Sequence, residues 1–308
     1  MRSFTALFLT FFGLAQPFCR AQDTVLDWSK KVIELQEVQG QNFEQDLLLV
    51  KGLLYLQRRS EALELIQKIN RIHQRKEPRL SELLETASNQ YFQQETMELF
   101  AEASILIRDD NWPEAKDRLD TALKKEPLHR ELLTTAIQVA LATGNVDRAA
   151  DLEKAGAPFY GDSMVWKTYR VWIQIQQKNG KEAMKILALL WNSTRAQFSR
   201  NEVWILAFLK TMELNKYQLD WDGVVKIIRR HPEWACSRLA KIRLKPLPSV
   251  KQRKELLEIK SVLEDPKKFQ SVLMVQEKEF RSQYKGLIPL ESCRKEVDDL
   301  LSKISETK

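Results

Sequence analysis

Apolar residues recur along most of this chain at spacings of three and four positions, the pattern of helices that bury one face. The pattern is clearest over residues 96–195, where the apolar positions do not alternate with polar ones as they would in a half-buried strand. Nine glycines and ten prolines are few for 308 residues, which is typical of helices joined by short turns. The pattern therefore predicts an all-α fold.

A short turn recurs every 34 residues in this stretch. Each turn has an asparagine and, four positions later, an alanine: Asn111 and Ala115, Asn145 and Ala149, Asn179 and Ala183. The turns define three helix pairs, predicted at 96–109 with 113–125, 129–143 with 146–155, and 163–178 with 181–191. A fixed period of this length is the sequence signature of a solenoid of stacked helix pairs, because one pair cannot bury its own apolar face.

Weaker helical patterns precede the three pairs. They predict a helix over 25–37, a first helix pair from Phe43 that ends at Pro78, and a further helix over 80–94. We expect one helical-repeat domain over residues 22–245.

The pattern also weakens after the three pairs. A degraded pair runs from Glu202 to Pro232, and three Lys/Glu-rich helices follow at about 249–263, 266–284 and 290–305. We expect the C-terminal segment 246–308 to cap the solenoid, since a terminal unit needs a polar outer face.

Residues 1–21 have the organisation of a secretory signal peptide. Arg2 precedes an apolar run over 6–15, and small residues stand three positions and one position before a cut ahead of Gln22. The alternative is an uncleaved anchor, although the run is shorter than the ~20 residues of a membrane span. We expect an exported protein of the periplasm or cell envelope that is not transmembrane.

Charge is concentrated in one segment. Loss of Arg2 and Arg20 with the signal peptide leaves 47 of 49 cations against 42 acids, or +5. Segment 226–254 alone carries +9, because ten cations face the single acid Glu233. The cations are Lys226, Arg229, Arg230, Arg238, Lys241, Arg243, Lys245, Lys251, Arg253 and Lys254.

Such a basic segment attracts anionic partners. In an exported protein these are lipid head groups, acidic envelope polymers or an acidic protein surface, whereas nucleic acid is not expected outside the cytosol. The alternative is an ordinary solvated face.

Cys236 and Cys293 are the cysteines that remain after residues 1–21 are removed. In an oxidising compartment they are candidates for a disulfide, provided their α-carbons lie within about 7 Å. The alternative is two buried free thiols, which behave as small apolar groups.

The sequence offers no recognisable catalytic set. His73, His129 and His231 are far apart and have no metal-ligand spacing. Glycine-rich phosphate loops and the GxSxG nucleophile turn are also missing from the sequence. We therefore expect no enzyme activity, no cofactor and no metal.

The three central units resemble the tetratricopeptide repeat (TPR). In the first unit Ala115 matches the second-helix alanine, and Ala103, Ala122 and Pro127 match three further consensus positions. The later units keep the second-helix alanine and depart elsewhere, at Ile137, Val171, Gly156 and Leu190. The usual first-helix tryptophan is replaced in all three units, by Leu99, Leu133 and Lys167.

The resemblance implies a right-handed α-solenoid whose inner groove binds peptides or partner proteins. The positions that it places on the inner face are Phe100, Ser104, Thr134, Gln138, Thr168 and Trp172. These side chains are neutral, so the family's carboxylate clamp is not expected. The alternative is that Phe100 and Trp172 belong to the core of a slightly misregistered unit.

Three functions follow from these features. The first is a non-catalytic protein- or peptide-binding scaffold or adaptor in a bacterial cell envelope. The second is a binder of anionic membrane surfaces or envelope polymers through segment 226–254. The third is an enzyme accessory, for which the chain has no candidate lytic domain.

Overall fold

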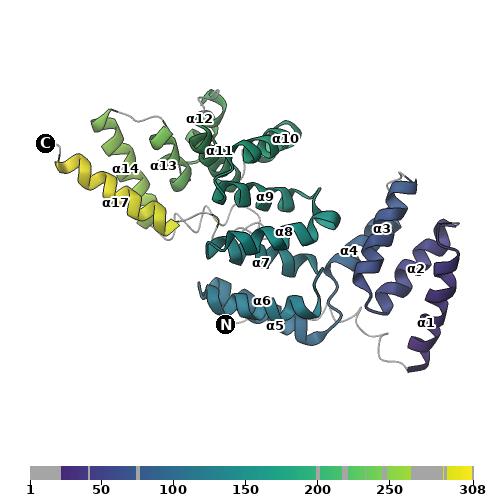
Figure 1. Cartoon of the computed structure of the whole chain (residues 1–308). Helices are drawn as coiled ribbons and strands as arrows, with labels where there is room; N and C mark the ends of the chain where they lie inside the picture. The colour runs from purple at the N-terminus through teal and green to yellow at the C-terminus, as the bar shows by residue number, and fades with distance from the viewer. Residues whose placement is uncertain are drawn as a thin grey trace, which may run out of the picture. The chain divides into compact units, whose positions relative to one another are not determined.

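A computed structural model describes residues 22–40, 42–73, 77–198, 202–216, 221–232, 234–244, 248–264, 287 and 290–306. Every regular element in these residues is an α-helix (Figure 1), so the predicted all-α fold is confirmed. The predicted signal peptide and the predicted helix over 266–284 lie outside the described residues. Backbone packing divides the chain into unit 1, Met1–Phe92, and unit 2, Gln93–Lys308.

Unit 1 is built around one buried helix. Its helices are α1 (Gln22–Glu37), α2 (Phe43–Tyr55), α3 (Arg59–His73) and α4 (Pro78–Asn89). Helix α2 packs against the other three and buries seven residues, among them Leu49 and Leu53. Pro78 begins α4 instead of ending the previous helix, because a proline at the first helical position loses no intrahelical hydrogen bond.

Unit 2 is a stack of helices that pack in chain order. Its helices are α5 (Gln94–Arg108), α6 (Trp112–Lys125), α7 (Arg130–Ala142), α8 (Val146–Tyr160), α9 (Met164–Gln176), α10 (Gly180–Phe198), α11 (Glu202–Asn215), α12 (Trp221–Arg230), α13 (Ala235–Leu244), α14 (Ser249–Glu264) and α17 (Leu290–Glu306). From α5 to α11 each helix packs against the next, and α7, α9, α11 and α13 also pack side by side as one layer. This arrangement is the predicted stack of helix pairs.

The 34-residue turn has a defined backbone geometry. The residue before each asparagine has a positive φ: 59° at Asp110, 72° at Gly144 and 59° at Lys178. The asparagine N–H then donates over 2.8 Å to a carbonyl of the preceding helix: Asn111 to Leu106, Asn145 to Ala140, and Asn179 to Gln174. This is the Schellman motif, which satisfies carbonyls left unpaired at a helix end.

Unit 1 contains the same turn outside the 34-residue count. Gln57 has a φ of 60°, and the Arg58 N–H donates to the carbonyl of Leu53 over 2.8 Å. Helices α2 and α3 therefore form a pair of the same type, although no asparagine marks the turn.

Small residues allow the helices of unit 2 to approach closely. Ala115, Ala149 and Ala183 are fully buried. Gly156 replaces the consensus alanine because the next pair fills the space: a Cβ at this position would lie 2.4 Å from the Trp166 indole. Trp166 is itself fully buried, and its Nε1 donates to the carbonyl of Glu153 over 3.2 Å.

Three helices differ most from the sequence expectation, among them α10, which continues to Phe198 instead of ending at residue 191. Helix α8 continues to Tyr160 instead of ending at residue 155, with Pro158 in its last turn. A proline has no N–H, so the helix continues there without the bond that residue 158 would otherwise donate to the carbonyl of Lys154. Helix α13 was not expected. The two compact units meet after Phe92, and within unit 2 helix α14 packs on α13.

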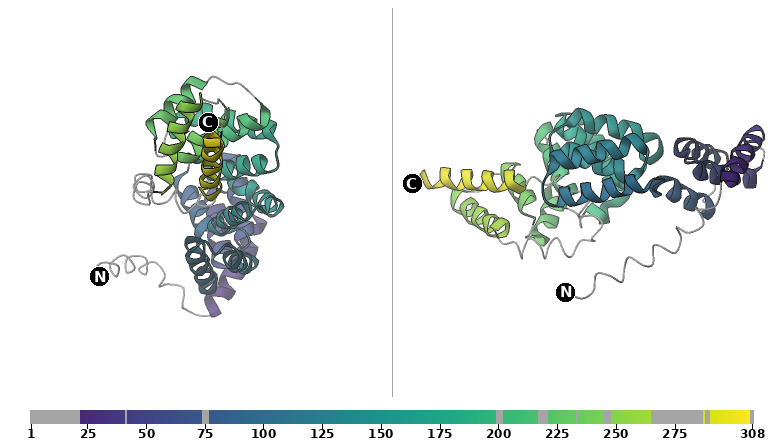
Figure 2. Two further views of the ribbon diagram at one scale, coloured as in Figure 1. Left: turned by 90° about the vertical axis from the view of Figure 1, so that its left-hand side faces the viewer. Right: turned by 90° about the horizontal axis from the view of Figure 1, so that it is seen from below.

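The C-terminal helices close the end of the stack. Helix α17 packs against α13 and α14, and Figure 2 shows α14 and α17 side by side. Cys236 of α13 and Cys293 of α17 form a disulfide, with 5.7 Å between their α-carbons. Arg243 and Lys260 add ion pairs to Glu296 and Asp298 of α17, at 2.6 and 2.8 Å.

Candidate partner-binding surfaces

The six predicted inner-face residues do not share one open surface. Thr134, Gln138, Thr168 and Trp172 are buried, at 8, 1, 3 and 2 % exposure. Phe100 is half-buried and Ser104 is exposed on α5. Only the first unit therefore offers its predicted residues to a partner.

The buried hydroxyls of this set bond within their own helices. Thr134 donates to the carbonyl of Glu131, and Thr168 donates to the carbonyl of Met164. Side chains that satisfy their hydroxyls locally need no partner molecule.

Trp172 lies in the core of unit 2, as the alternative interpretation stated. The Lys210 ammonium of α11 lies 5.4 Å from the centroid of the Trp172 ring, an arrangement that attracts a cation to an aromatic face. Burial and the nearby Arg243 guanidinium lower the pKa of Lys210, while Glu213 and Glu296 act in the opposite direction. Trp172 therefore joins α9 to α11 and is not a groove anchor.

Three cations of the basic segment are neutralised by acids from other helices. Arg238 is 7 % exposed and pairs with Glu255 and Glu258 of α14, at 3.1 and 2.8 Å. Lys241 pairs with Glu255 at 3.3 Å. Burial pushes the pKa of Glu255 up, but Arg238 and Lys241 outweigh it and hold that pKa below its usual range.

Arg243 is the third paired cation. It bridges Glu213 of α11 at 3.1 Å and Glu296 of α17 at 2.6 Å. The predicted continuous patch over Lys226–Lys245 is therefore absent from the described residues, because the folded chain brings acids to its centre. Lys245 lies outside the described residues.

The remaining cations are exposed at two places. Lys226, Arg229 and Arg230 lie on α12, and Lys251, Arg253 and Lys254 lie on α14. Among the described residues, these six cations are the part of the predicted basic surface that is exposed.

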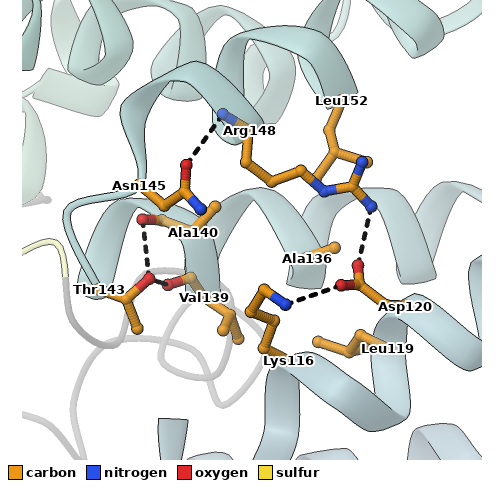
Figure 3. A pocket seen from close by; sticks show the side chains of 10 residues that line it. All are labelled: Lys116, Leu119, Asp120, Ala136, Val139, Ala140, Thr143, Asn145, Arg148 and Leu152. Carbon is orange, nitrogen blue, oxygen red and sulfur yellow. Dashed lines mark hydrogen bonds and ion pairs between the residues drawn. The ribbon is translucent and has the colours of Figure 1, made fainter. Parts of the chain in front are cut away.

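A small niche between α6, α7 and α8 carries a charge network (Figure 3). The Asp120 carboxylate accepts from Lys116 at 3.1 Å and from Arg148 at 2.8 Å. Burial raises the pKa of Asp120, but the two cations outweigh it and lower that pKa. The open space is about 10 Å³, room for one water at most, so the network ties two repeats together and does not bind a ligand.

Unit 1 contains a larger cleft, of about 230 Å³, between the end of α1, helix α2 and the start of α3. Its apolar lining consists of Leu49, Leu53 and Leu65, and its polar lining consists of Gln36, Gln39, Glu61, Glu64 and Lys68. The three leucines are at most 4 % exposed, so they form the floor. The amides, carboxylates and ammonium form the rim.

The two glutamates of the rim, Glu61 and Glu64, differ in how firmly neighbouring groups hold their carboxylates. Arg58 donates to both carboxylate oxygens of Glu61, through Nε at 2.5 Å and through Nη2. Glu64 is exposed and accepts from the Ser60 hydroxyl at 3.3 Å. Glu64 is therefore the carboxylate that a basic ligand can reach with the least competition.

The sequence did not indicate this cleft. Its residues come from helices outside the 34-residue count, and the leucines of its floor have the same spacing as any core position. The Schellman turn that sets α3 against α2 has no glycine and no asparagine to mark it.

Other kinds of site are not found in the described residues. No group of three or more His, Cys, Asp or Glu side chains there is placed to hold a metal ion. None of the helices described here is both long enough and apolar enough to cross a membrane.

The 34-residue period, the Schellman turn and the buried alanine define a TPR-like helical repeat protein. No family model matches the chain, and no curated protein matches it. A solved structure of a tetratricopeptide repeat protein from Parabacteroides merdae ATCC 43184 is similar with a TM-score of 0.41 at 13% identity, over 87% of this chain and 96% of that chain.

Proposed function

We propose that this chain is a non-catalytic scaffold that binds a protein or peptide partner through the cleft of unit 1. The observation that carries the proposal is the cleft itself, an opening over a leucine floor with a polar rim. Its volume is below the about 300 to 1,000 Å³ of sites for drug-sized ligands. That size suits one or two side chains of a peptide better than a cofactor.

The rim determines the kind of peptide. An apolar side chain of the ligand lies above Leu49 and Leu53, where its own apolar surface leaves water. The two leucines are already buried, so they contribute packing contacts. The Gln36 and Gln39 amides can each donate to and accept from a peptide backbone. A neighbouring lysine or arginine of the ligand pairs with Glu64. The expected ligand is therefore a segment with an apolar anchor next to a basic residue.

Selection of peptides from a random displayed library on residues 22–308 tests the proposal. The selected peptides should share an apolar residue beside a basic one, and Glu64→Lys should weaken their binding about tenfold or more because it places a cation against a cation. Glu98→Lys on α5 of unit 2 makes the same change in net charge at an exposed position that does not line the cleft, and should leave the affinity unchanged. Equal losses in the two variants would reject the cleft as the site.

We also propose that the scaffold works in the periplasm or cell envelope after loss of residues 1–21. The Cys236–Cys293 disulfide supports this location, because disulfides persist in oxidising compartments and are rare in the cytosol. The N-terminal residue of the protein purified from its host should be Gln22. A protein that keeps Met1 and is recovered with reduced thiols would contradict export.

A further inference from the structure

Helix α14 carries an exposed stripe that its packing in unit 2 does not explain. One side of the helix is core, with Leu256, Ile259 and Leu263 at most 6 % exposed. Val250 and Leu257 are 81 and 45 % exposed. Residues seven positions apart share a helix face, so these two apolar side chains form one stripe facing away from the core.

Cations surround the apolar stripe. Arg253 and Lys254 follow Val250 by three and four positions and therefore lie between Val250 and Leu257 on the same face. Lys251 lies beside them, and all three cations are exposed. We call the five residues Val250, Lys251, Arg253, Lys254 and Leu257 the α14 face.

The acids of this helix do not neutralise the α14 face. Glu255 and Glu258 pair with Arg238 on α13, at 3.1 and 2.8 Å. Within the described residues, no ion pair joins a carboxylate to the three cations of the face. The face therefore presents a charge of +3 around two apolar side chains.

Helix stability does not account for these charges. The first turn of α14 has no acidic residue, and all three cations lie within its first six positions. Lys251 lies in the first turn, where a cation opposes the helix dipole, whereas Arg253 and Lys254 lie beyond the turn within which that effect falls off. The helix dipole therefore gives no reason for a cation at any of the three positions.

We propose that the α14 face binds the surface of an anionic lipid bilayer, with the helix parallel to the membrane plane. Lysine and arginine gain energy from the negative surface potential of acidic lipids. Exposed apolar side chains on the same helix face enter the boundary between head groups and acyl chains. This binding is separate from the peptide cleft of unit 1 and would hold the scaffold at a membrane surface.

Sedimentation with lipid vesicles tests the proposal. Residues 22–308 should bind vesicles that contain phosphatidylglycerol and not vesicles of phosphatidylcholine alone, and binding should weaken as salt shortens the range of the charges. The triple variant Lys251→Glu, Arg253→Glu, Lys254→Glu should lose about 100-fold or more in affinity, since each cation contributes about fivefold. The double variant Val250→Ser, Leu257→Ser should bind the vesicles more weakly, with an unchanged dependence on salt.

The exposed cations of α12 provide a matched control. The variant Lys226→Glu, Arg229→Glu, Arg230→Glu changes the net charge by the same amount and should keep vesicle binding. Equal losses in the two triple variants would overturn the proposal, since attraction would then follow total charge. Equal binding to vesicles with and without phosphatidylglycerol would also overturn it. So would binding to a soluble acidic polymer that is as tight as binding to vesicles and is unchanged by the substitutions at Val250 and Leu257. Circular dichroism checks that each variant is folded. If the triple glutamate variant of α14 is unfolded, a variant with glutamine at the same three positions takes its place.

Discussion

The layer of first helices in unit 2 and the cleft of unit 1 are both built from stacked, largely buried helices, but they differ in which buried side chains lie beneath an opening. Helix α7 buries nine of its 13 residues and α9 buries seven of 13, as α2 does, and in unit 2 the buried positions include ones that the repeat pattern places on an inner face. In unit 1, a cleft of about 230 Å³ remains above Leu49 and Leu53. A position in a repeat therefore predicts a helix face, while packing between neighbouring helices decides whether that face is open.

The largest change in stability should come from a substitution in the buried layer of first helices in unit 2. Trp172→Ala removes a buried indole and should lower the free energy of unfolding of unit 2 by about 3 to 5 kcal/mol. Its Nε1 has no hydrogen-bond partner among the described residues, so Trp172→Phe should cost much less. Chemical denaturation measures both. A Trp172→Ala protein of unchanged stability would mean that this surface is open after all.

The disulfide closes the end of the stack and should have the next largest effect. Replacing Cys236 and Cys293 by alanine should lower the free energy of unfolding by about 2 to 4 kcal/mol, because the unfolded chain loses a cross-link. Thermal melting with and without reductant measures it in the unaltered protein. Peptide binding by unit 1 should not change, and a parallel loss of binding would contradict separate roles for the two regions.

Close packing between repeats should respond to a single methyl group. Gly156→Ala places a Cβ 2.4 Å from Trp166 and should cost about 1 to 3 kcal/mol through overpacking. Gly223→Ala on α12 is the matched control, because its Cβ would meet nothing within 4 Å. That change should be neutral or slightly stabilising. Similar effects at the two glycines would contradict the account of the Trp166 contact.

The smallest effect should come from the charge network between repeats. The pKa of Asp120 is lowered in the folded protein, so its contribution to stability is present above the ordinary pKa of aspartate and is lost as the pH falls through the folded value. Asp120→Asn should cost about 1 kcal/mol at neutral pH, since the site is partly exposed to solvent. The difference in the free energy of unfolding between this variant and the unaltered protein should vanish at acid pH. A difference that is constant with pH would exclude an ionic role for Asp120.

The sequence predicted the elements of unit 2 better than its surfaces. The 34-residue period located the pairs from α5 to α10 because Asn111, Asn145 and Asn179 follow the Schellman residue directly. The period does not extend to the pair in unit 1, where Gln57 adopts the same φ without a marker residue. The apolar pattern from Phe43 predicted that pair.

Charge could be counted along the chain but not placed in space. Arg238 and Arg243 look unopposed in segment 226–254, yet their partners Glu255, Glu258, Glu213 and Glu296 all lie outside it. Pairing of this kind depends on contacts between α11, α13, α14 and α17, which no local pattern encodes. The burial of Gln138 and Thr168 has the same origin in the packing of α7 against α9.

Site-specific cross-linking distinguishes the cleft of unit 1 from the predicted inner face of unit 2 most directly. A photo-activatable amino acid replaces Lys68 on the cleft rim in one protein and Ser104 on the predicted inner face in another. Each protein is irradiated with the tightest peptide selected on residues 22–308. We expect a peptide adduct at position 68 and none at position 104. An adduct at position 104 alone would contradict this expectation and return the binding site to the inner face of unit 2.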